Sequence, residues 1–180
     1  MSSVGVQEKG LVILYTGEGK GKTTAALGLV LRAVGYKNKC LIVQFGKSWF
    51  TGELVGIKKL PGVKIVQGGK GFLGILGNKV SKEDHKKAAS EAYSLLYKEV
   101  ISGKWDVVVA DEIVGAVSSG VLGLNQVVKL IKDKPKNLDL VLTGHYASKK
   151  LIQMADLVTE MQEVKHPFQK GILAKRGIDF

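Results

Sequence analysis

The sequence has little cysteine, little proline and no long apolar run. Its single cysteine, Cys40, cannot form a disulfide within the chain, and its place in the run KCLIVQF predicts a buried strand residue in a reducing compartment. No segment approaches the roughly 20 apolar residues that a membrane helix needs. The opening residues MSSVGVQEKG contain no apolar signal core. We therefore expect a soluble cytoplasmic protein.

Acidic residues are also scarce. The chain has 16 aspartates and glutamates against 27 lysines and arginines, which gives a net charge of +11. Such a charge raises the question of nucleic acid. The lysines are spread along the chain, however, and no aromatic residues are interleaved with them to stack bases. A basic nucleic-acid-binding module stays an alternative, but we expect a solvated basic surface and no nucleic-acid partner.

Apolar runs and helical patterns alternate along the chain. This alternation predicts the α/β class, with an open, mostly parallel sheet of about five to six strands and helices on both faces. At 180 residues one domain is expected, with a short flexible leader at 1–10 and a tail at 164–180. Strands are expected at 11–15, 39–45, 63–66, 107–110, 139–143 and 157–161. Helices are expected at 23–34, 81–101, 125–132 and 148–154, long loops at 46–60 and 67–80, and a polar, glycine-containing stretch before residue 125.

The most informative segment is LVILYTGEGKGKTT at residues 11–24. An apolar strand runs into alternating glycines and lysines, and a helix opens directly after them. Glycines permit positive φ and close approach of the backbone, so the loop amides can converge on an anion. The N-terminus of the following helix presents further N–H groups to the same point. The expected nucleotide-binding residues of this segment are Gly17, Glu18, Gly19, Lys20, Gly21, Lys22, Thr23 and Thr24.

Lys22 and Thr23 have separate expected roles in this loop. Lys22 would place a positive charge on the outer phosphates, and the Thr23 hydroxyl would hold Mg²⁺. The usual P-loop pattern needs glycine at position 16, where this chain has Thr16, so the loop is one residue shorter than usual. The order of strand, glycine loop, GKTT and helix still predicts a nucleotide site, against the alternative of a lysine-bearing surface turn.

Two carboxylates follow another apolar strand, in the segment WDVVVADE. Asp111 and Glu112 come at the carboxyl end of that strand, where open α/β sheets bind their ligands. One or both are expected to reach Mg²⁺, because this ion needs only one or two carboxylates besides phosphate oxygens and waters. The alternative is a pair of acidic residues that stabilises a helix N-terminus.

The loop QGGKGFLGILGNKV at 67–80 is apolar for a loop. It carries Phe72, Leu73 and Ile75 among five glycines, which suggests an exposed flap. A phosphate site alone does not need such a flap, so a large apolar second substrate is expected. Of the histidines outside these motifs, His85 is expected to be solvated among lysines on a helix, and His166 is expected to shape a turn beside Pro167.

Taken together, these motifs resemble the P-loop family of ATP:corrinoid adenosyltransferases, the cob(I)alamin or cob(I)yrinic acid a,c-diamide adenosyltransferases. The resemblance covers nearly the whole chain and is carried by the shortened loop and by the tail with its KHPF, GI and RGI elements. The matching segments are YTGEGKGKTTAALGLVLRAVG, VQFGKSWFTGE, GGKGF, VVVADEI, LTG and ADLVTEMQEVKHPFQKGILAKRGIDF.

This resemblance implies a RecA-like P-loop fold, usually dimeric, that binds MgATP and a reduced corrinoid in adenosylcobalamin biosynthesis or salvage. The Co(I) centre would attack the 5′-carbon of ATP and release inorganic triphosphate, without a covalent enzyme intermediate. The protein would then position the substrates and stabilise charge. An electron-donating reductase is implied as a partner.

The resemblance also assigns residues. Lys22, Thr23 and Glu112 would be catalytic, with Thr23, Glu112 and the nearby Asp111 around Mg²⁺. The loop would grip the γ-phosphate and leave the 5′-carbon exposed. A family arginine that contacts ATP matches Arg32, and the flap residues Phe72, Leu73 and Ile75 would pack on the corrin face.

Two positions depart from the family pattern. Relatives commonly have TGR where this chain has Thr143, Gly144 and His145, so His145 is the candidate for a phosphate contact there. Some relatives have tryptophan at the position of Gly74. The rival reading of the same loop is a P-loop ATPase or kinase that acts on the γ-phosphate. The product distinguishes the two classes, since adenosyl transfer releases triphosphate and phosphoryl transfer releases ADP.

Overall fold

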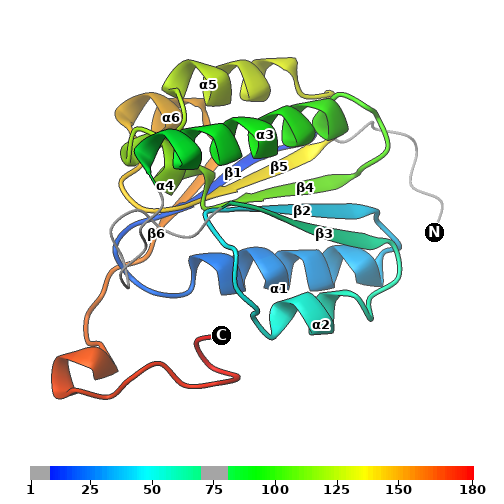
Figure 1. Ribbon diagram of the computed structural model, residues 1–180. Helices are drawn as coiled ribbons and strands as arrows, with labels where there is room; N and C mark the ends of the chain where they lie inside the picture. Colours follow the sequence, from blue (N-terminus) through cyan, green and yellow to red (C-terminus); the bar gives the residue numbers. More distant parts are fainter. Residues whose placement is uncertain (1–8, 70–80) are drawn as a thin grey trace.

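The computed structural model describes residues 9–69 and 81–180, which form a six-stranded sheet between two layers of helices (Figure 1). All the strands are parallel, in the order β3-β2-β4-β5-β1-β6. The strands are β1 (Val12–Thr16), β2 (Cys40–Phe45), β3 (Val63–Gly68), β4 (Val107–Asp111), β5 (Asp139–Thr143) and β6 (Leu157–Glu160). The helices are α1 (Lys22–Gly35), α2 (Glu53–Ile57), α3 (Lys82–Val100), α4 (Ile113–Ser118), α5 (Leu124–Asp133), α6 (Lys149–Met154) and the 3-10 helix η1 (Pro167–Lys170). This is the predicted α/β class, and it is consistent with a RecA-like P-loop fold.

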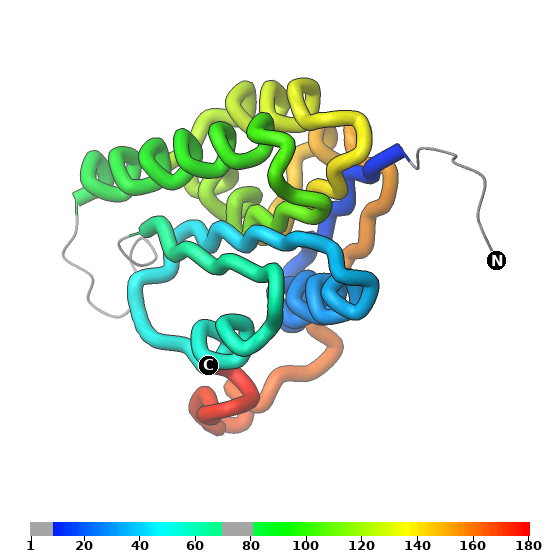
Figure 2. Tube along the Cα trace, turned by 90° about the vertical axis from the view of Figure 1, so that its right-hand side faces the viewer, coloured from blue at the N-terminus to red at the C-terminus, as the bar shows by residue number. Residues whose placement is uncertain are grey.

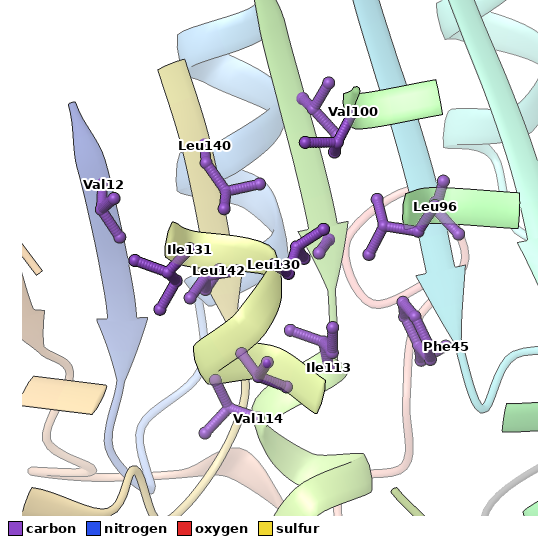
Figure 3. Packing of buried hydrophobic residues seen from close by; sticks show 14 of the residues in the cluster. Val12, Phe45, Leu96, Val100, Ile113, Val114, Leu130, Ile131, Leu140 and Leu142 are labelled. Atoms are coloured by element: carbon purple, nitrogen blue, oxygen red, sulfur yellow. The ribbon is translucent and has the colours of Figure 1, made fainter. Parts of the chain in front are cut away.

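The central strands are apolar throughout because both of their faces are covered. Side chains alternate along each strand, so Leu41, Val43 and Phe45 of β2 pack on one face while Cys40 and Ile42 pack on the other. Helices α3, α4, α5 and α6 cover the first face, whose packing is drawn in Figure 3. Helices α1 and α2 cover the second face. Cys40 is buried there, as the sequence predicts, and burial raises the pKa of its thiol to about 11.

The predicted strands and the four predicted helices are present with small shifts of their ends. Ser81 caps α3, with its hydroxyl accepting a hydrogen bond from the Asp84 N–H at 3.1 Å. Two short helices were not predicted: α2 lies within the segment expected to be a loop at 46–60, and α4 follows β4 directly. Each has only one or two turns and an internal glycine, so neither shows a helical pattern long enough to recognise.

His85 corrects another expectation. It lies in the first turns of α3, but its side chain is buried rather than solvated. The lysines around it occupy other faces of the helix. His166 does shape a turn, because its Nδ1 accepts from the Phe168 N–H at 3.2 Å at the start of η1. Among the described helices, none is long and apolar enough to cross a membrane.

The strand order determines where a site can form. Parallel strands direct all their carboxyl ends to one edge, and the order places β4 between β2 and β5, with β1 beside β5. The loops after β1, β2, β4 and β5 therefore meet at this edge. They carry the glycine loop, Lys47, the Asp111–Glu112 pair and His145.

Candidate active site

The glycine loop wraps around the ammonium group of Lys22. Gly17 and Gly21 have φ values of 97° and 113°, which residues other than glycine rarely adopt. Lys22 begins α1 and is only 6% exposed. Its Nζ donates to the carbonyl oxygens of Gly17 at 2.8 Å and Gly19 at 2.7 Å. The loop is thus curled around a buried positive charge at the N-terminus of a helix, which is a favourable place for an anion.

The loop rests on the segment that follows β6. The Gly19 N–H donates to the Met161 carbonyl at 2.7 Å. A Cβ at Gly19 would lie 2.6 Å from the carbonyl carbon of Gln162, and a Cβ at Gly17 would also collide with the Met161 backbone. These two glycines are therefore required by the neighbouring backbone, in addition to any role toward phosphate. The sequence analysis did not anticipate this contact.

Asp111 joins four elements of the site. Its side chain is 1% exposed. Oδ1 accepts from the hydroxyls of Thr23 and Thr143, each at 2.8 Å. Oδ2 accepts from Gln44 Nε2 at 3.1 Å and lies 3.2 Å from Lys47 Nζ. This carboxylate is fully engaged with protein groups, and it fixes the orientation of the Thr23 hydroxyl.

Glu112 has a different environment from its neighbour. It adopts a left-handed conformation with φ of 63°, and its N–H donates to Thr143 Oγ1 at 2.9 Å. Burial, followed by the nearby charge of Asp111, raises the pKa of the Glu112 carboxyl above its usual range. A side chain at Gly115 would overlap Glu112 Oε1, so Gly115 leaves room for this carboxylate. A desolvated carboxylate of this kind gains from a nearby cation.

The oxygen atoms of Thr23 and Glu112 fit the Mg²⁺ that the sequence predicts, whereas Asp111 is engaged by protein groups and orients the Thr23 hydroxyl. Hydroxyl and carboxylate oxygens are the donors that a hard divalent ion prefers. In residues 9–69 and 81–180 no three His, Cys, Asp or Glu side chains cluster as a complete metal site. Mg²⁺ usually takes one or two carboxylates together with the phosphates of its nucleotide.

These groups line a cavity of about 590 Å³. Three lysines, Lys20, Lys22 and Lys47, line it together with the carboxylates of Glu53, Glu112 and Asp179. Burial lowers the pKa of Lys22, and the neighbouring Glu112 partly opposes this effect. His145 also lines the cavity, and burial followed by the charge of Lys22 lowers the pKa of its imidazole. Lysines, carboxylates and a histidine thus face the same cavity, which suits a polyanion that carries a divalent cation.

A family model of the ATP:corrinoid adenosyltransferases BtuR/CobO/CobP matches residues 8–180 of this chain. The chain belongs to this family. It is therefore a transferase whose substrates are ATP and a corrinoid.

Individual relatives agree with this assignment. A corrinoid adenosyltransferase of Escherichia coli (strain K12) is 34% identical over 174 residues, which cover 96% of this chain and 87% of that protein. One from Sinorhizobium sp is 38% identical over 178 residues, covering 96% of this chain and 81% of that protein. The corrinoid adenosyltransferase CobA of Salmonella typhimurium (strain LT2) is 33% identical over 175 residues, covering 97% and 87% respectively.

Seven of the twelve predicted site residues in the described part of the chain face the cavity of this adenosyltransferase. Those that line it are Lys20, Gly21, Lys22, Thr23, Thr24, Glu112 and His145. Gly17 and Glu18 instead line a second cavity of about 530 Å³ on the side of the loop toward β6. Arg32 lies in the last turn of α1, exposed and away from both cavities, so its contact with ATP stays a prediction. Phe72, Leu73 and Ile75 lie outside the described residues.

Sequence reasoning missed four features of the site. Asp111 accepts hydrogen bonds from Gln44 and Thr143 and forms an ion pair with Lys47. The cavity is also lined by residues 177–180 of the tail. Gln44 had a recognisable signal, since a glutamine within the apolar run KCLIVQF predicts a buried partner. The approach of the tail had no local signal, because it depends on tertiary packing.

Proposed function

We propose that this adenosyltransferase transfers the 5′-deoxyadenosyl group of ATP to the Co(I) centre of a reduced corrinoid and releases inorganic triphosphate. The observation that carries the proposal is the curled glycine loop around Lys22, facing the same cavity as Glu112 and two further lysines. Lys20, Lys22 and Lys47 supply positive charge that would stabilise the departing triphosphate. The reaction would serve adenosylcobalamin biosynthesis or salvage.

The triphosphate would bind the loop amides and the first turn of α1. Lys22 Nζ would exchange its two carbonyl partners for phosphate oxygens, and Lys20 and Lys47 would add charge at the rim. Thr23 and Glu112 would hold Mg²⁺, which neutralises part of the triphosphate charge, while Asp111 orients the Thr23 hydroxyl. In this arrangement the loop binds the γ-phosphate and the ribose points away from it.

The reaction balances without a nucleophile from the protein. A cobalt–carbon bond forms, the bond between C5′ and its phosphate oxygen breaks, and the electron pair leaves with the triphosphate. Cobalt is oxidised from Co(I) to Co(III) in this step. The chain stabilises the charge that develops on the leaving group, mainly through Lys22. A reductase that supplies Co(I), a cytoplasmic location and contacts of Phe72, Leu73 and Ile75 with the corrin ring stay predictions.

The test is to mix the protein with MgATP and chemically reduced cobalamin and to follow the corrin absorbance while measuring the phosphate products. We expect a spectral change with stoichiometric triphosphate. Lys22→Ala should reduce the rate by at least about a hundredfold, because it removes the buried charge beside the leaving group. The control is Lys58→Ala, which alters an exposed lysine outside the cavity.

Two results would contradict the proposal. ADP as the product would favour an ATPase or kinase, and a normal rate for Lys22→Ala would remove the loop from the reaction. We also infer that the enzyme is a homodimer. Support comes from the edge strand β6 and from the tail, where several large apolar side chains are exposed.

A further inference from the structure

Residues 175–180 fold into a turn that is held together by Asp179. The Asp179 N–H donates to the Lys175 carbonyl at 2.8 Å, and Asp179 Oδ2 accepts from the Lys175 N–H at 2.7 Å. The Gly177 N–H donates to the Phe180 carbonyl at 2.8 Å, with Gly177 at a φ of 79°. This segment is thus a defined turn rather than an extended tail.

The turn lines the nucleotide cavity. On one side the Asp179 carboxylate forms an ion pair with Lys20 of the glycine loop. On the other side the Phe180 backbone lies 3.9 Å from the Cβ position of Gly52, at the start of α2. In Figures 1 and 2 the red end of the chain accordingly lies beside α2. The turn therefore spans the glycine loop and the segment between β2 and α2.

The cavity lining contains both charged and apolar side chains. Lys22, Lys47, Glu53 and Glu112 are charged, whereas Leu27, Ile178 and Phe180 are apolar. Ile178 is 72% exposed and Phe180 is 43% exposed, although both line the cavity. Large apolar side chains that stay exposed at a cavity wall are suited to cover the flat face of a base.

We propose that residues 177–180 form the nucleoside-binding wall of the site. Ile178 and Phe180 contact the adenosyl half of ATP, and Asp179 positions this wall through its ion pair with Lys20. The inference rests on the proposed function, because it assumes that the glycine loop holds the triphosphate. Asp179 is a positioning residue in this scheme, since it acts through the turn and through Lys20.

Inorganic triphosphate has no nucleoside to contact the wall, so substitutions in the wall should weaken binding of ATP but not binding of triphosphate. We expect the double variant Ile178→Ala with Phe180→Ala to raise the dissociation constant for MgATP about tenfold, because apolar contact is lost. Its dissociation constant for magnesium triphosphate should stay within about twofold of the wild-type value. Calorimetric titration measures both, and Leu31→Ala, which truncates an exposed apolar side chain of α1 outside the cavity, is the matched control.

Asp179→Asn gives an independent test of the ion pair. The amide oxygen of asparagine keeps an acceptor for the Lys175 N–H but loses the charge that pairs with Lys20. We expect the ratio of the ATP to the triphosphate dissociation constant to rise about threefold or more. Triphosphate itself should bind at least as tightly, because a negative charge beside the loop is gone.

The outcomes separate the two proposals. Equal weakening of ATP and triphosphate binding in the double variant, or no change in either, overturns the nucleoside wall while leaving the glycine loop as the phosphate site. An unchanged ratio in Asp179→Asn removes the positioning role of Asp179. Wild-type protein that binds neither ligand overturns the proposed function and this inference with it.

Discussion

Asp111 and Glu112 are adjacent in the chain but have opposite surroundings. Asp111 is paired on both oxygens, whereas Glu112 turns into the cavity and carries a desolvated carboxylate with a raised pKa. The reason is local: β4 ends at Asp111, and the positive φ of Glu112 redirects its side chain. The structure thus assigns Asp111 to holding Thr23 and turns Glu112 toward the cavity.

The raised pKa of Glu112 predicts a pH-dependent stability difference for Glu112→Gln. The folded state holds this proton more tightly than the unfolded chain, so the stability that the group contributes is present below the unfolded pKa and is lost as pH rises through the folded pKa. Without nucleotide or Mg²⁺, the variant should therefore unfold at higher urea than the wild type at about pH 8. The two proteins should converge near about pH 4.

The matched control is Glu83→Gln, at an exposed position in the first turn of α3. It should show no stabilisation at about pH 8. Destabilisation of Glu112→Gln at that pH would contradict the argument and would mean that the ionised carboxylate is favourably paired. Glu112→Gln should also lose adenosyl transfer, because a neutral amide attracts Mg²⁺ less than a carboxylate does.

At the residue scale, site residues could be predicted from the sequence where the residues of a motif are neighbours in the chain. The loop glycines, Lys22, Thr23 and the two carboxylates were predicted from motifs, and the structure brings Thr23 and Asp111 into hydrogen-bond contact. The sequence did not separate Asp111 from Glu112, because both follow the same strand and only backbone φ distinguishes them. Lys47 was not predicted as a site residue because its partners, Glu53 and Asp111, lie on different elements.

At the scale of elements, length decided what was predictable. The 14-residue helix α1 and the 19-residue helix α3 show clear helical patterns, and buried parallel strands read as apolar runs. Helices α2 and α4 have five and six residues, too few for such a pattern. The contact of the glycine loop with Met161 and Gln162 follows from the pairing of β1 with β6, which the sequence does not specify.

Two glycines near each other in the chain should respond in opposite ways to substitution by alanine. Gly19→Ala places a methyl group against the Gln162 backbone, so the loop must shift. We expect a loss of about 1–3 kcal/mol in unfolding free energy and weaker triphosphate binding. Gly28 lies within α1, and nothing lies within 4 Å of its Cβ position. Gly28→Ala should raise stability by about 0.5–1 kcal/mol.

Chemical denaturation and calorimetric titration with triphosphate measure both effects. Gly28→Ala serves as the control for the added methyl group, since it should leave triphosphate affinity unchanged. A Gly19→Ala protein with wild-type stability and affinity would show that the loop does not depend on its contact with the segment after β6.

At the scale of the whole molecule, the site draws on distant parts of the chain. The loops after β1, β2, β4 and β5 meet because the strand order brings their carboxyl ends together, and residues 177–180 of the tail line the same cavity. The alternation of elements predicted a parallel sheet but not this order, since several orders satisfy the same alternation. For this reason the site residues within each loop could be predicted from the sequence. The approach of residues 177–180 to these loops could not be predicted.

The surface of β6 and the tail leads to the last prediction, which concerns assembly. All four residues of β6 are exposed, and an edge strand of this kind presents unpaired backbone groups. Close to it in the chain, Val164 is 93% exposed and Leu173 is 74% exposed. Side chains of this type on one connected segment favour a contact with a second copy. We expect the protein, with a chain mass of 19.4 kDa, to sediment as a dimer.

Val164→Glu combined with Leu173→Glu should then shift sedimentation to the monomer, because a dimer contact would bury two charges without partners. Leu31→Glu introduces a charge at another exposed apolar position, on α1, and should leave the dimer intact. Because neither Val164 nor Leu173 lines the nucleotide cavity, triphosphate binding reports whether the monomer keeps its fold. A wild-type monomer at all concentrations, or a dimer that survives the double substitution, would place any interface elsewhere and leave the tail to the nucleotide site alone.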